Sequence, residues 1–495
     1  MEYLNEILAQ LSGILWGWPM IVLLLGTHIF LTIRLHFPQR HILKAIRLSV
    51  SKDTDSDGDV SQFAALATAL AATIGTGNII GVGTAVALGG PGAVFWCWLT
   101  GVFGIATKYG EALLAVKYRV ASHDGKMLGG PMYALEYGLG GSARSNTMRR
   151  FWRMMAIAFA LFTAIATFGI GASVQSNAMS TMGYETYGIP TVTTGVLTTI
   201  LAATVIIGGV KSIARCCKVL VPFMALLYVI GCVVILCINS SFILPAIRLI
   251  VESAFTDDAA TGGLAGSAII IAARYGIARG LFSNESGLGS APLVAAAAQT
   301  RNPVRQALVS SSGTFWDTVV ICAITGIVVV SSILAYPDIR VEDGGVLTRL
   351  AFSKIPYIGE PLLVFGLLTF AFSTILGWSY YGERGTEYLA NKWLSSRTKR
   401  HTMTDAEAAK TVRRILACYR ILFILTVYIG AVISLEMVWN IADIFNALMA
   451  IPNLLSLLFL STVIVHETRK YLWRDNLDKV QSPCVFSVPS STHQK

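Results

Sequence analysis

Long apolar stretches alternate with short polar segments along almost the whole chain. An α-helix rises about 1.5 Å per residue, so roughly 20 apolar residues can cross the hydrocarbon core of a membrane. Eleven stretches fit this pattern: residues 13–33, 61–87, 92–117, 151–176, 190–210, 217–239, 264–298, 307–335, 361–382, 413–434 and 437–465. The pattern predicts an all-α polytopic membrane protein with eleven transmembrane helices.

The stretch 61–87 has a centre that does not suit a continuous helix. It holds Gly75, Thr76, Gly77 and Asn78 in place of long apolar side chains. Gly costs about 1 kcal/mol in a helix interior relative to Ala, and Asn prefers helix caps. A break at membrane depth is tolerated where it lines a cavity or a ligand site. The alternative is an unbroken helix whose small residues allow close packing.

The stretch 264–298 is too long for one crossing and contains polar residues. Arg274, Arg279, Asn284 and Glu285 all lie within it, and such residues inside a membrane span are functional candidates. We expect a second break between residues 280 and 287, with Glu285 and Arg279 forming an ion pair that holds it. The alternative is one helix followed by a re-entrant or interfacial segment.

The two broken stretches are five spans apart, which predicts an internal repeat. The spans from 61 to 239 and those from 264 to 465 form two sets of five, each opening with a broken helix. Because five is odd, the second set is inverted, as in the leucine-transporter-type fold. The predicted parts are a peripheral helix and loop (1–60), two repeats (61–240 and 241–466) and a tail (467–495).

Charge is distributed unevenly between alternate loops. The chain is 54% hydrophobic and 13% charged, with a net charge of +10. Most Lys and Arg residues lie within 34–52, 117–153, 211–218, 301–305, 384–414 and 469–474. The positive-inside rule then predicts a multi-pass protein of the plasma membrane (a bacterial inner membrane), with the N-terminus outside and the C-terminus cytoplasmic. Topology accounts for the positive charge, so no nucleic-acid partner is expected.

Four motifs resemble the alanine or glycine:cation symporter family. They are GTGNIIGVGTAVALGGPGAVFWCW (75–98), GGPMYALE (129–136), ARGLFSNESGLGSAP (278–292) and FAFSTILGWSYYGER (370–384). The resemblance covers roughly residues 60–465. It implies a sodium-coupled, sometimes proton-coupled, importer of small amino acids on the inverted-repeat fold.

The first break predicts a site for a substrate carboxylate. The N–H groups at the start of its second half-helix, together with the helix dipole, favour an anion. We assign the carboxylate to the backbone of Thr76 and Gly77, helped by Asn78. The second break is expected to offer carbonyls to the amino group, with the side chain of Asn284 beside Leu281 and Phe282.

Two further side chains are assigned to the substrate pocket. Gln175 should face the bundle, and the resemblance places it in the pocket; a helix–helix hydrogen bond is the alternative. Trp378 shares a helical face with Thr374 at spacing i,i+4 and would exclude long side chains, so alanine or glycine would fit best. The alternative for Trp378 is an interfacial aromatic belt.

The resemblance also implies a sodium site between the spans 61–87 and 361–382. We assign it to the backbone near Ala72 and Gly75 and to the hydroxyls of Ser373 and Thr374. Hydroxyl and freed carbonyl oxygens suit a hard monovalent cation. Na⁺ is expected as the coupling ion, and no other cofactor is expected because the eight cysteines show no metal-binding pattern.

Other functions have less support. Proton coupling would need a carboxylate relay, for which Glu111 or Glu285 are the candidates. An integral-membrane enzyme is not expected because the chain has no HExxH motif and no His/Asp cluster. Two inequivalent broken helices are typical of a transporter that works by alternating access, and less typical of a channel. The expected partners are a small amino acid, Na⁺ and the lipid bilayer; the oligomeric state stays open.

Overall fold

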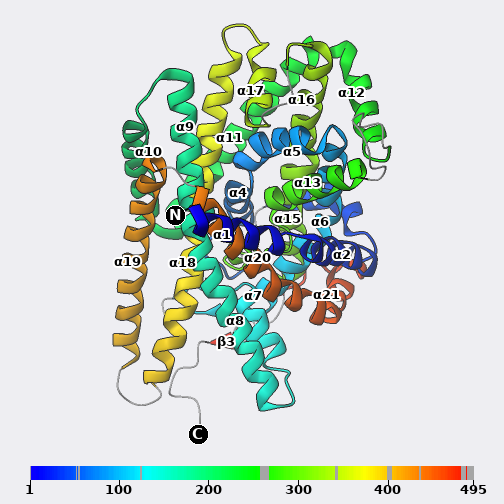
Figure 1. Ribbon diagram of the computed structural model, residues 1–495. Helices are drawn as coiled ribbons and strands as arrows, with labels where there is room; N and C mark the ends of the chain where they lie inside the picture. The colour runs from blue at the N-terminus through cyan, green and yellow to red at the C-terminus, as the bar shows by residue number, and fades with distance from the viewer. Residues whose placement is uncertain are drawn as a thin grey trace.

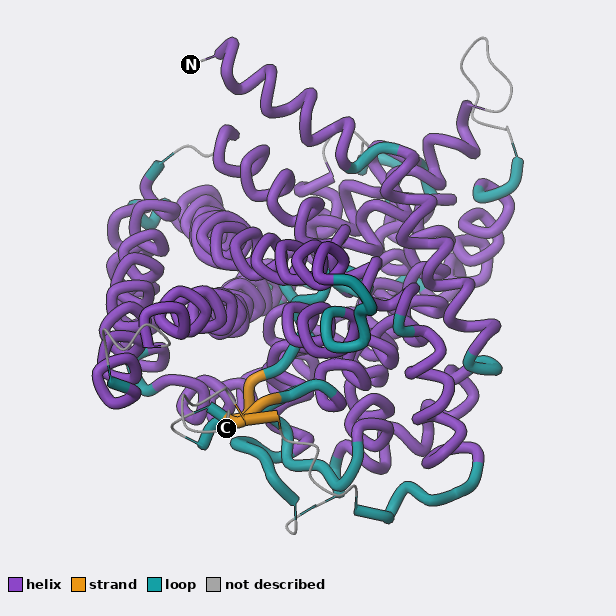
Figure 2. Tube along the Cα trace, turned by 90° about the horizontal axis from the view of Figure 1, so that it is seen from below, coloured by secondary structure: helices purple, strands orange, loops and turns teal. Residues whose placement is uncertain are grey.

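The computed structural model describes residues 2–51, 53, 56–122, 125–256, 267–339, 344–398, 404–433, 436–480 and 486–487. The chain forms a helical bundle in which α18, α19 and α8 run along the long direction of the view (Figure 1). The strands are short: β1 (Val120–Ala121) pairs antiparallel with β2 (Met127–Leu128) and parallel with β3 (Phe486–Ser487). Figure 2 shows this small sheet in orange.

In the first half of the chain, the described residues form twelve α-helices. They are α1 (Glu2–Leu15), α2 (Trp18–Arg34), α3 (Ile42–Ser49), α4 (Gln62–Thr73), α5 (Val82–Gly89), α6 (Gly92–Lys117), α7 (Pro131–Tyr133), α8 (Asn146–Ala166), α9 (Val174–Tyr187), α10 (Thr191–Ile206), α11 (Gly209–Ile238) and α12 (Ser240–Ser253). A 3₁₀ turn, η1 (Pro38–His41), and π-helical segments η2 (Gly77–Gly81), η3 (Ala134–Leu139) and η4 (Thr167–Ser173) connect or extend them.

The second half also consists of α-helices with short π-helical segments. Its helices are α13 (Ser267–Asn284), α14 (Pro292–Ala295), α15 (Pro303–Thr314), α16 (Ala323–Ala335), α17 (Gly344–Ser353), α18 (Gly359–Thr398), α19 (Asp405–Val432), α20 (Glu436–Phe459) and α21 (Ser461–Thr468). The π-helical segments η5 (Phe315–Cys322) and η6 (Arg469–Trp473) continue α15 and α21. Residues 264–266 and 434 of the predicted spans, and most of the tail beyond 480, lie outside the described residues.

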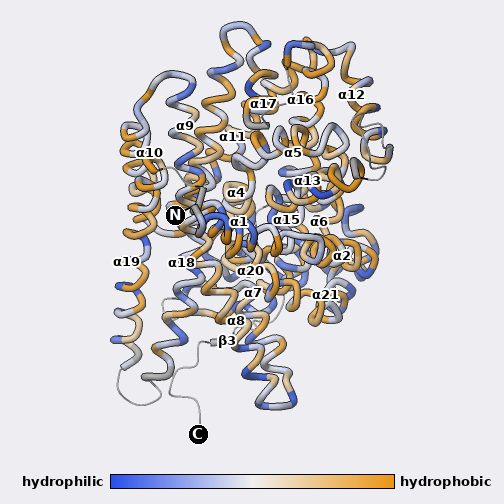
Figure 3. Tube along the Cα trace, in the orientation of Figure 1, coloured by the Kyte–Doolittle hydropathy of each residue, from blue (hydrophilic) through white to orange (hydrophobic). Residues whose placement is uncertain are grey.

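The helices are apolar enough for a membrane. Among the described residues, seven helices have the length and composition to cross a bilayer, and the bent pair 62–73 and 77–89 makes an eighth. Large apolar side chains on α10 and α19 face outward, including Leu197, Leu201 and Leu422, and Figure 3 shows both helices in largely hydrophobic colours. The helical membrane class is confirmed. The count of eleven stays a prediction, because α6, α10 and α13 do not meet the same test.

Several helices extend beyond their predicted spans. The span predicted at 151–176 is part of a continuous helix over residues 146–187. Similarly, α18 continues to Thr398, beyond the predicted end at 382. The apolar pattern detects only the part of a helix that matches hydrocarbon, whereas charged turns that continue a helix into water leave no such signal. The pattern also did not predict α12 and α17, which have only 14 and 10 residues and are too short to cross a bilayer.

The break in the first broken helix is confirmed. Ser61 caps the start of α4, since its hydroxyl accepts a hydrogen bond of 3.2 Å from the N–H of Ala64, and the helix ends where Ile74 becomes extended, with ψ 93°. The next turn is the π-helical segment η2, and the two halves are bent by 54°. The unbroken alternative is therefore wrong.

A second break follows α13. The helix ends at Asn284, and positive φ angles follow at Glu285 (52°), Gly287 (94°) and Gly289 (85°). The remaining half is shorter than expected, since α14 has only four residues. Gly280 stays helical, and a side chain there would collide with Thr100 on α6, so this glycine allows close packing of the two helices.

The ends of the two broken helices meet in a backbone pairing. Val60 forms a parallel bridge with Ala298, and the N–H of Gln299 donates a hydrogen bond of 2.8 Å to the carbonyl of Val60. The Arg119 guanidinium donates a bond of 3.0 Å to the carbonyl of Ala298. This pairing closes the bundle at the end where the basic loops lie.

The N-terminal stretch predicted as one peripheral helix is divided in two near Gly17. α1 runs across the bundle and not along α18 and α19 (Figure 1). It packs on α20, where the Trp16 indole N–H donates a hydrogen bond of 3.0 Å to the carbonyl of Asp443. α1 therefore contacts one of the core helices directly.

Candidate functional site

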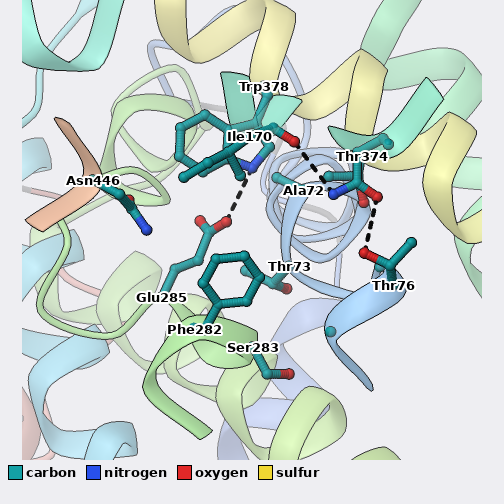
Figure 4. A pocket seen from close by; sticks show the side chains of 13 residues that line it. Ala72, Thr73, Thr76, Ile170, Phe282, Ser283, Glu285, Thr374, Trp378 and Asn446 are labelled. Atoms are coloured by element: carbon teal, nitrogen blue, oxygen red, sulfur yellow. Dashed lines mark hydrogen bonds between the residues drawn. The ribbon is translucent and has the colours of Figure 1, made fainter. Parts of the chain in front are cut away.

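A central cavity lies between the two breaks and has an empty volume of about 310 Å³, part of it open to solvent. Figure 4 shows side chains from α4, α13, α18 and α20 converging on it. Its lining consists of Ala72, Thr73, Gly75, Thr76, Gly77, Ile170, Gln175, Phe282, Ser283, Glu285, Thr374, Trp378 and Asn446. Segments from both halves of the chain therefore build one site.

The first break contributes its backbone to the cavity. Thr76 and Gly77 stand at the start of η2, where the first N–H groups of a helix have no partner within it. The hydroxyl of Thr76 donates a hydrogen bond of 3.3 Å to Oε1 of Gln175, and Nε2 of Gln175 donates one of 3.3 Å to the carbonyl of Ile170. Gln175 is buried and joins the break to η4 beside the cavity.

Asn78 points away from the cavity. Its Oδ1 accepts a hydrogen bond of 2.9 Å from the N–H of Gly75, and its Nδ2 donates one of 2.8 Å to Oδ1 of Asp317. The side chain thus shapes the break and fastens it to η5. It does not line the space in which we expected it to help bind a carboxylate.

Asp317 was not predicted as a site residue. Besides Asn78, its carboxylate accepts hydrogen bonds from the hydroxyls of Ser283 (3.0 Å) and Thr318 (2.6 Å). It therefore connects the first break with α13. A carboxylate inside a predicted span was the signal available in the sequence, but the sequence gives no indication of which partners it finds.

The second break places Glu285 in the cavity. Its carboxylate accepts a hydrogen bond of 3.1 Å from the indole N–H of Trp378 and another from the hydroxyl of Ser290. The predicted ion pair between Glu285 and Arg279 is wrong, because the positive φ at Glu285 turns its carboxylate toward α18. Arg279 instead interacts electrostatically with Asp443.

Two other residues assigned at the second break lie behind the cavity wall. Leu281 belongs to the main apolar core. The Oδ1 atom of Asn284 accepts a hydrogen bond of 2.9 Å from the N–H of Ser286 and closes the end of α13. Of the three residues assigned there, Phe282 lines the cavity. Ser283 and Glu285, which had not been assigned as substrate-binding residues, also line it.

α18 supplies Trp378 and Thr374 from one face, as their spacing predicts. Trp378 is only 1% exposed, so the interfacial belt is wrong. Gly171 allows η4 to approach it, since a Cβ at that position would collide with the Trp378 side chain. The indole forms a rigid wall opposite the first break.

The predicted pairing of α4 with α18 is present where we placed the cation. The hydroxyls of Ser373 and Thr374 each donate a hydrogen bond of 3.1 Å to the carbonyl of Ala71. A Cβ on Gly75 would lie 2.7 Å from Oγ1 of Thr374, so this glycine lets the backbone approach the hydroxyl. Ala72, Gly75 and Thr374 line the cavity, whereas Ser373 lies behind them. Hydroxyl and carbonyl oxygens of this kind fit Na⁺.

A second polar network supports the second break from α6. Oε1 of Glu111 accepts hydrogen bonds from the N–H groups of Gly287 (2.9 Å) and Gly289 (3.1 Å) and from Nδ2 of Asn453 (2.7 Å). From the sequence, Glu111 is a candidate only for a proton relay. In the structure, it holds the irregular backbone in place.

Known proteins are similar to this chain over most of its length. The family model described as "Sodium:alanine symporter family" matches residues 1–484. The sodium/alanine symporter AgcS of Methanococcus maripaludis is 48% identical over 93% of this chain and 95% of its own. The probable sodium/glutamine symporter GlnT of Bacillus subtilis is 33% identical over 95% and 91%.

A similar fold is found among solved structures. The crystal structure of MhsT in complex with L-phenylalanine aligns with a TM-score of 0.50 and covers 83% of this chain and 98% of that one. At 13% identity, this likeness concerns the fold alone. It supports the predicted leucine-transporter-type architecture.

Proposed function

The chain belongs to the sodium:alanine symporter family, as its four motifs predict, and we propose that it imports a small neutral amino acid, alanine or glycine, together with Na⁺ by alternating access. Its similar relatives are membrane transporters. The observation that carries the proposal is the central cavity, where both helix breaks meet Trp378 and Thr374.

The two ends of an amino acid match different walls of the cavity. The N–H groups at Thr76 and Gly77 suit the carboxylate. The carboxylate of Glu285 suits the ammonium group and takes over the role that we expected of Asn284, because it lines the cavity. Gln175 lies beside the carboxylate position and fixes Thr76.

The size of the side chain is limited by Trp378 and Ile170. The hydrogen bond to Glu285 fixes the indole, so a longer substrate side chain would have to displace it. A relative named as a glutamine symporter is 33% identical, which indicates that substrates differ within the family. The fixed indole favours alanine or glycine here.

The coupling ion would be held near Thr374. Ala72, Gly75 and Thr374 provide oxygen atoms at the wall of the cavity, and Ser373 supports them through Ala71. Na⁺ bound there would stand next to the amino-acid site, so each would stabilise the other. The uneven distribution of Lys and Arg supports an outside N-terminus and a cytoplasmic C-terminus in a bacterial plasma membrane.

Uptake into proteoliposomes tests the proposal. Labelled alanine should accumulate under an inward Na⁺ gradient and should not accumulate when choline replaces Na⁺ at constant pH. Accumulation driven by a proton gradient without Na⁺ would favour the alternative, a proton-coupled transporter of the same fold that uses Glu285. Labelled glycine and glutamine, measured in parallel, rank the substrates.

A further inference from the structure

A second cavity lies next to the central one and has not been assigned a role. It has an empty volume of about 700 Å³, part of it open to solvent, and is bounded by α1, α13 and α20. Phe282 lines both cavities, so its ring stands at their boundary. We call this space the outer cavity.

The outer cavity contains charges of both signs. Arg274 and Arg279 line it from α13, and Asp443 lines it from α20. Among the described residues, neither arginine forms an ion pair, although Arg279 and Asp443 interact electrostatically. Arg274 lies over the ring of Tyr275, at 5.8 Å from its centroid. Arg274 is exposed, whereas Arg279 and Asp443 are partly buried, and charged side chains on the helices of a membrane protein are candidates for a ligand path.

We propose that the outer cavity binds the amino-acid zwitterion transiently before it passes Phe282. The guanidinium groups of Arg274 and Arg279 would receive the carboxylate, and Asp443 the ammonium group. This inference rests on the proposed function and deepens it by assigning a second substrate site. Two positive charges against one negative charge favour arrival with the carboxylate first.

The position of the outer cavity agrees with import. The opposite end of the broken helices is closed by the pairing of Val60 with Ala298, on the side of the basic loops. The outer cavity lies beside α13, which follows a connection poor in Lys and Arg and therefore predicted to be outside. A substrate coming from that side meets the two arginines before the central cavity.

The N-terminal helix completes the outer cavity. Ser12 and Gly13 of α1 and Trp16, directly after α1, form one wall, and the Trp16 indole N–H donates to the carbonyl of Asp443. Trp16 thereby holds the α20 backbone that carries the carboxylate. α1 is thus part of the proposed path, in contrast to the peripheral role predicted for this region.

The test compares uptake kinetics with equilibrium binding. Arg279→Gln, Arg274→Gln and Asp443→Asn are measured for Na⁺-driven alanine uptake, with Arg279→Lys as the conservative variant. Arg248→Gln is the control, because Arg248 is exposed on α12 and pairs only with Glu252 on its own helix in the described structure. Equilibrium alanine binding is measured on the same purified proteins.

The neutral variants should raise the KM for alanine about fivefold or more at low ionic strength, because each removes a charged partner of the carboxylate or of the ammonium group. Arg279→Lys should retain a near-normal KM, and equilibrium affinity should stay within about twofold of wild type. Raising ionic strength with choline chloride at constant Na⁺ should increase the wild-type KM and leave that of the variants almost unchanged.

Two results would overturn the inference. One is an unchanged KM in all three neutral variants. The other is an equal loss of equilibrium affinity and maximal rate that Arg279→Lys fails to rescue, since that would indicate a structural role. Failure of the proposed function is separate, because it would appear as absence of Na⁺-dependent uptake by the wild type.

Discussion

Trp378 and Glu285 are joined across the central cavity by a hydrogen bond of 3.1 Å from the indole N–H to Oε1. This bond connects α18 with the second break (Figure 4). The residue that we propose limits substrate size thus also orients the residue that would bind the ammonium group.

Trp378→Phe should weaken alanine binding while keeping an aromatic wall. The variant removes the N–H donor and leaves a buried acceptor without its partner, which costs about 1–3 kcal/mol. Calorimetry on purified protein at fixed Na⁺ measures the affinity. Trp98→Phe is the control, because Trp98 is 37% exposed and lies outside the cavity; equal affinities in both variants would contradict this role.

Thr374→Ala and Gln175→Ala should each weaken binding of the cation or the amino acid by about 1–3 kcal/mol, which is roughly 5- to 150-fold. Thr374→Ser keeps the hydroxyl and should retain most of the Na⁺ dependence. Titration of Na⁺ at fixed alanine, and of alanine at fixed Na⁺, separates the two effects. Unchanged affinities in well-folded Thr374→Ala and Gln175→Ala proteins would refute both assignments.

Gly75→Ala should abolish Na⁺-dependent uptake. The new Cβ would lie 2.7 Å from Oγ1 of Thr374, so the hydroxyl assigned to the cation would have to move. Gly366→Ala on α18 is the matched control, since a Cβ there has only an ordinary contact of 3.9 Å with Tyr228. Uptake in proteoliposomes and thermal stability in detergent are measured for both, and normal uptake by Gly75→Ala would show that close approach is unnecessary.

Gly77→Val should prevent alanine binding because the larger side chain would fill part of the central cavity. Gly77 has no positive φ, and a Cβ there would lie 3.5 Å from Phe282, which is an ordinary contact. Backbone strain is therefore a minor effect, and the two methyl groups would occupy the space assigned to the carboxylate. Gly77→Ala should retain partial alanine binding, and equal binding by the Ala and Val variants would contradict the steric explanation.

Asp59 should make stability depend on pH. Burial raises the pKa of this carboxyl above its ordinary value of 3.8, although it accepts a hydrogen bond from the N–H of Met127. Since the folded protein favours the protonated form, stability should fall as pH rises from 3.8 through the raised pKa. Asp59→Asn should lose this part of the pH dependence, which unfolding temperatures measured across that range would show.

Both breaks could be predicted from the sequence because they depend on local chemistry. Gly75 and Gly77 interrupt an apolar run, and Asn284 and Glu285 interrupt another. Likewise, the spacing of Thr374 and Trp378 places them on one face, whatever the rest of the chain does. The family resemblance then identified which spans pair, and the hydrogen bonds from Thr374 to Ala71 agree with it.

The directions of polar side chains could not be predicted in this way. Asn78 has donor and acceptor atoms that would suit a ligand, but Asp317 is a nearer partner on a helix over 200 residues away in sequence. Glu285 turned from Arg279 toward Trp378 for the same reason. Such choices depend on which segments become neighbours in the folded chain, and local spacing does not contain that information.

The position of Asp317 has a mechanical consequence. Its carboxylate is bonded to Asn78 behind the first break and to Ser283 behind the second, so a displacement of either broken helix alone would stretch one of these bonds. The two helices are therefore expected to shift together, with η5 moving as part of the same rigid unit. Whichever side of the cavity opens, we expect this unit to slide against α18. The contact between the two breaks should stay unchanged.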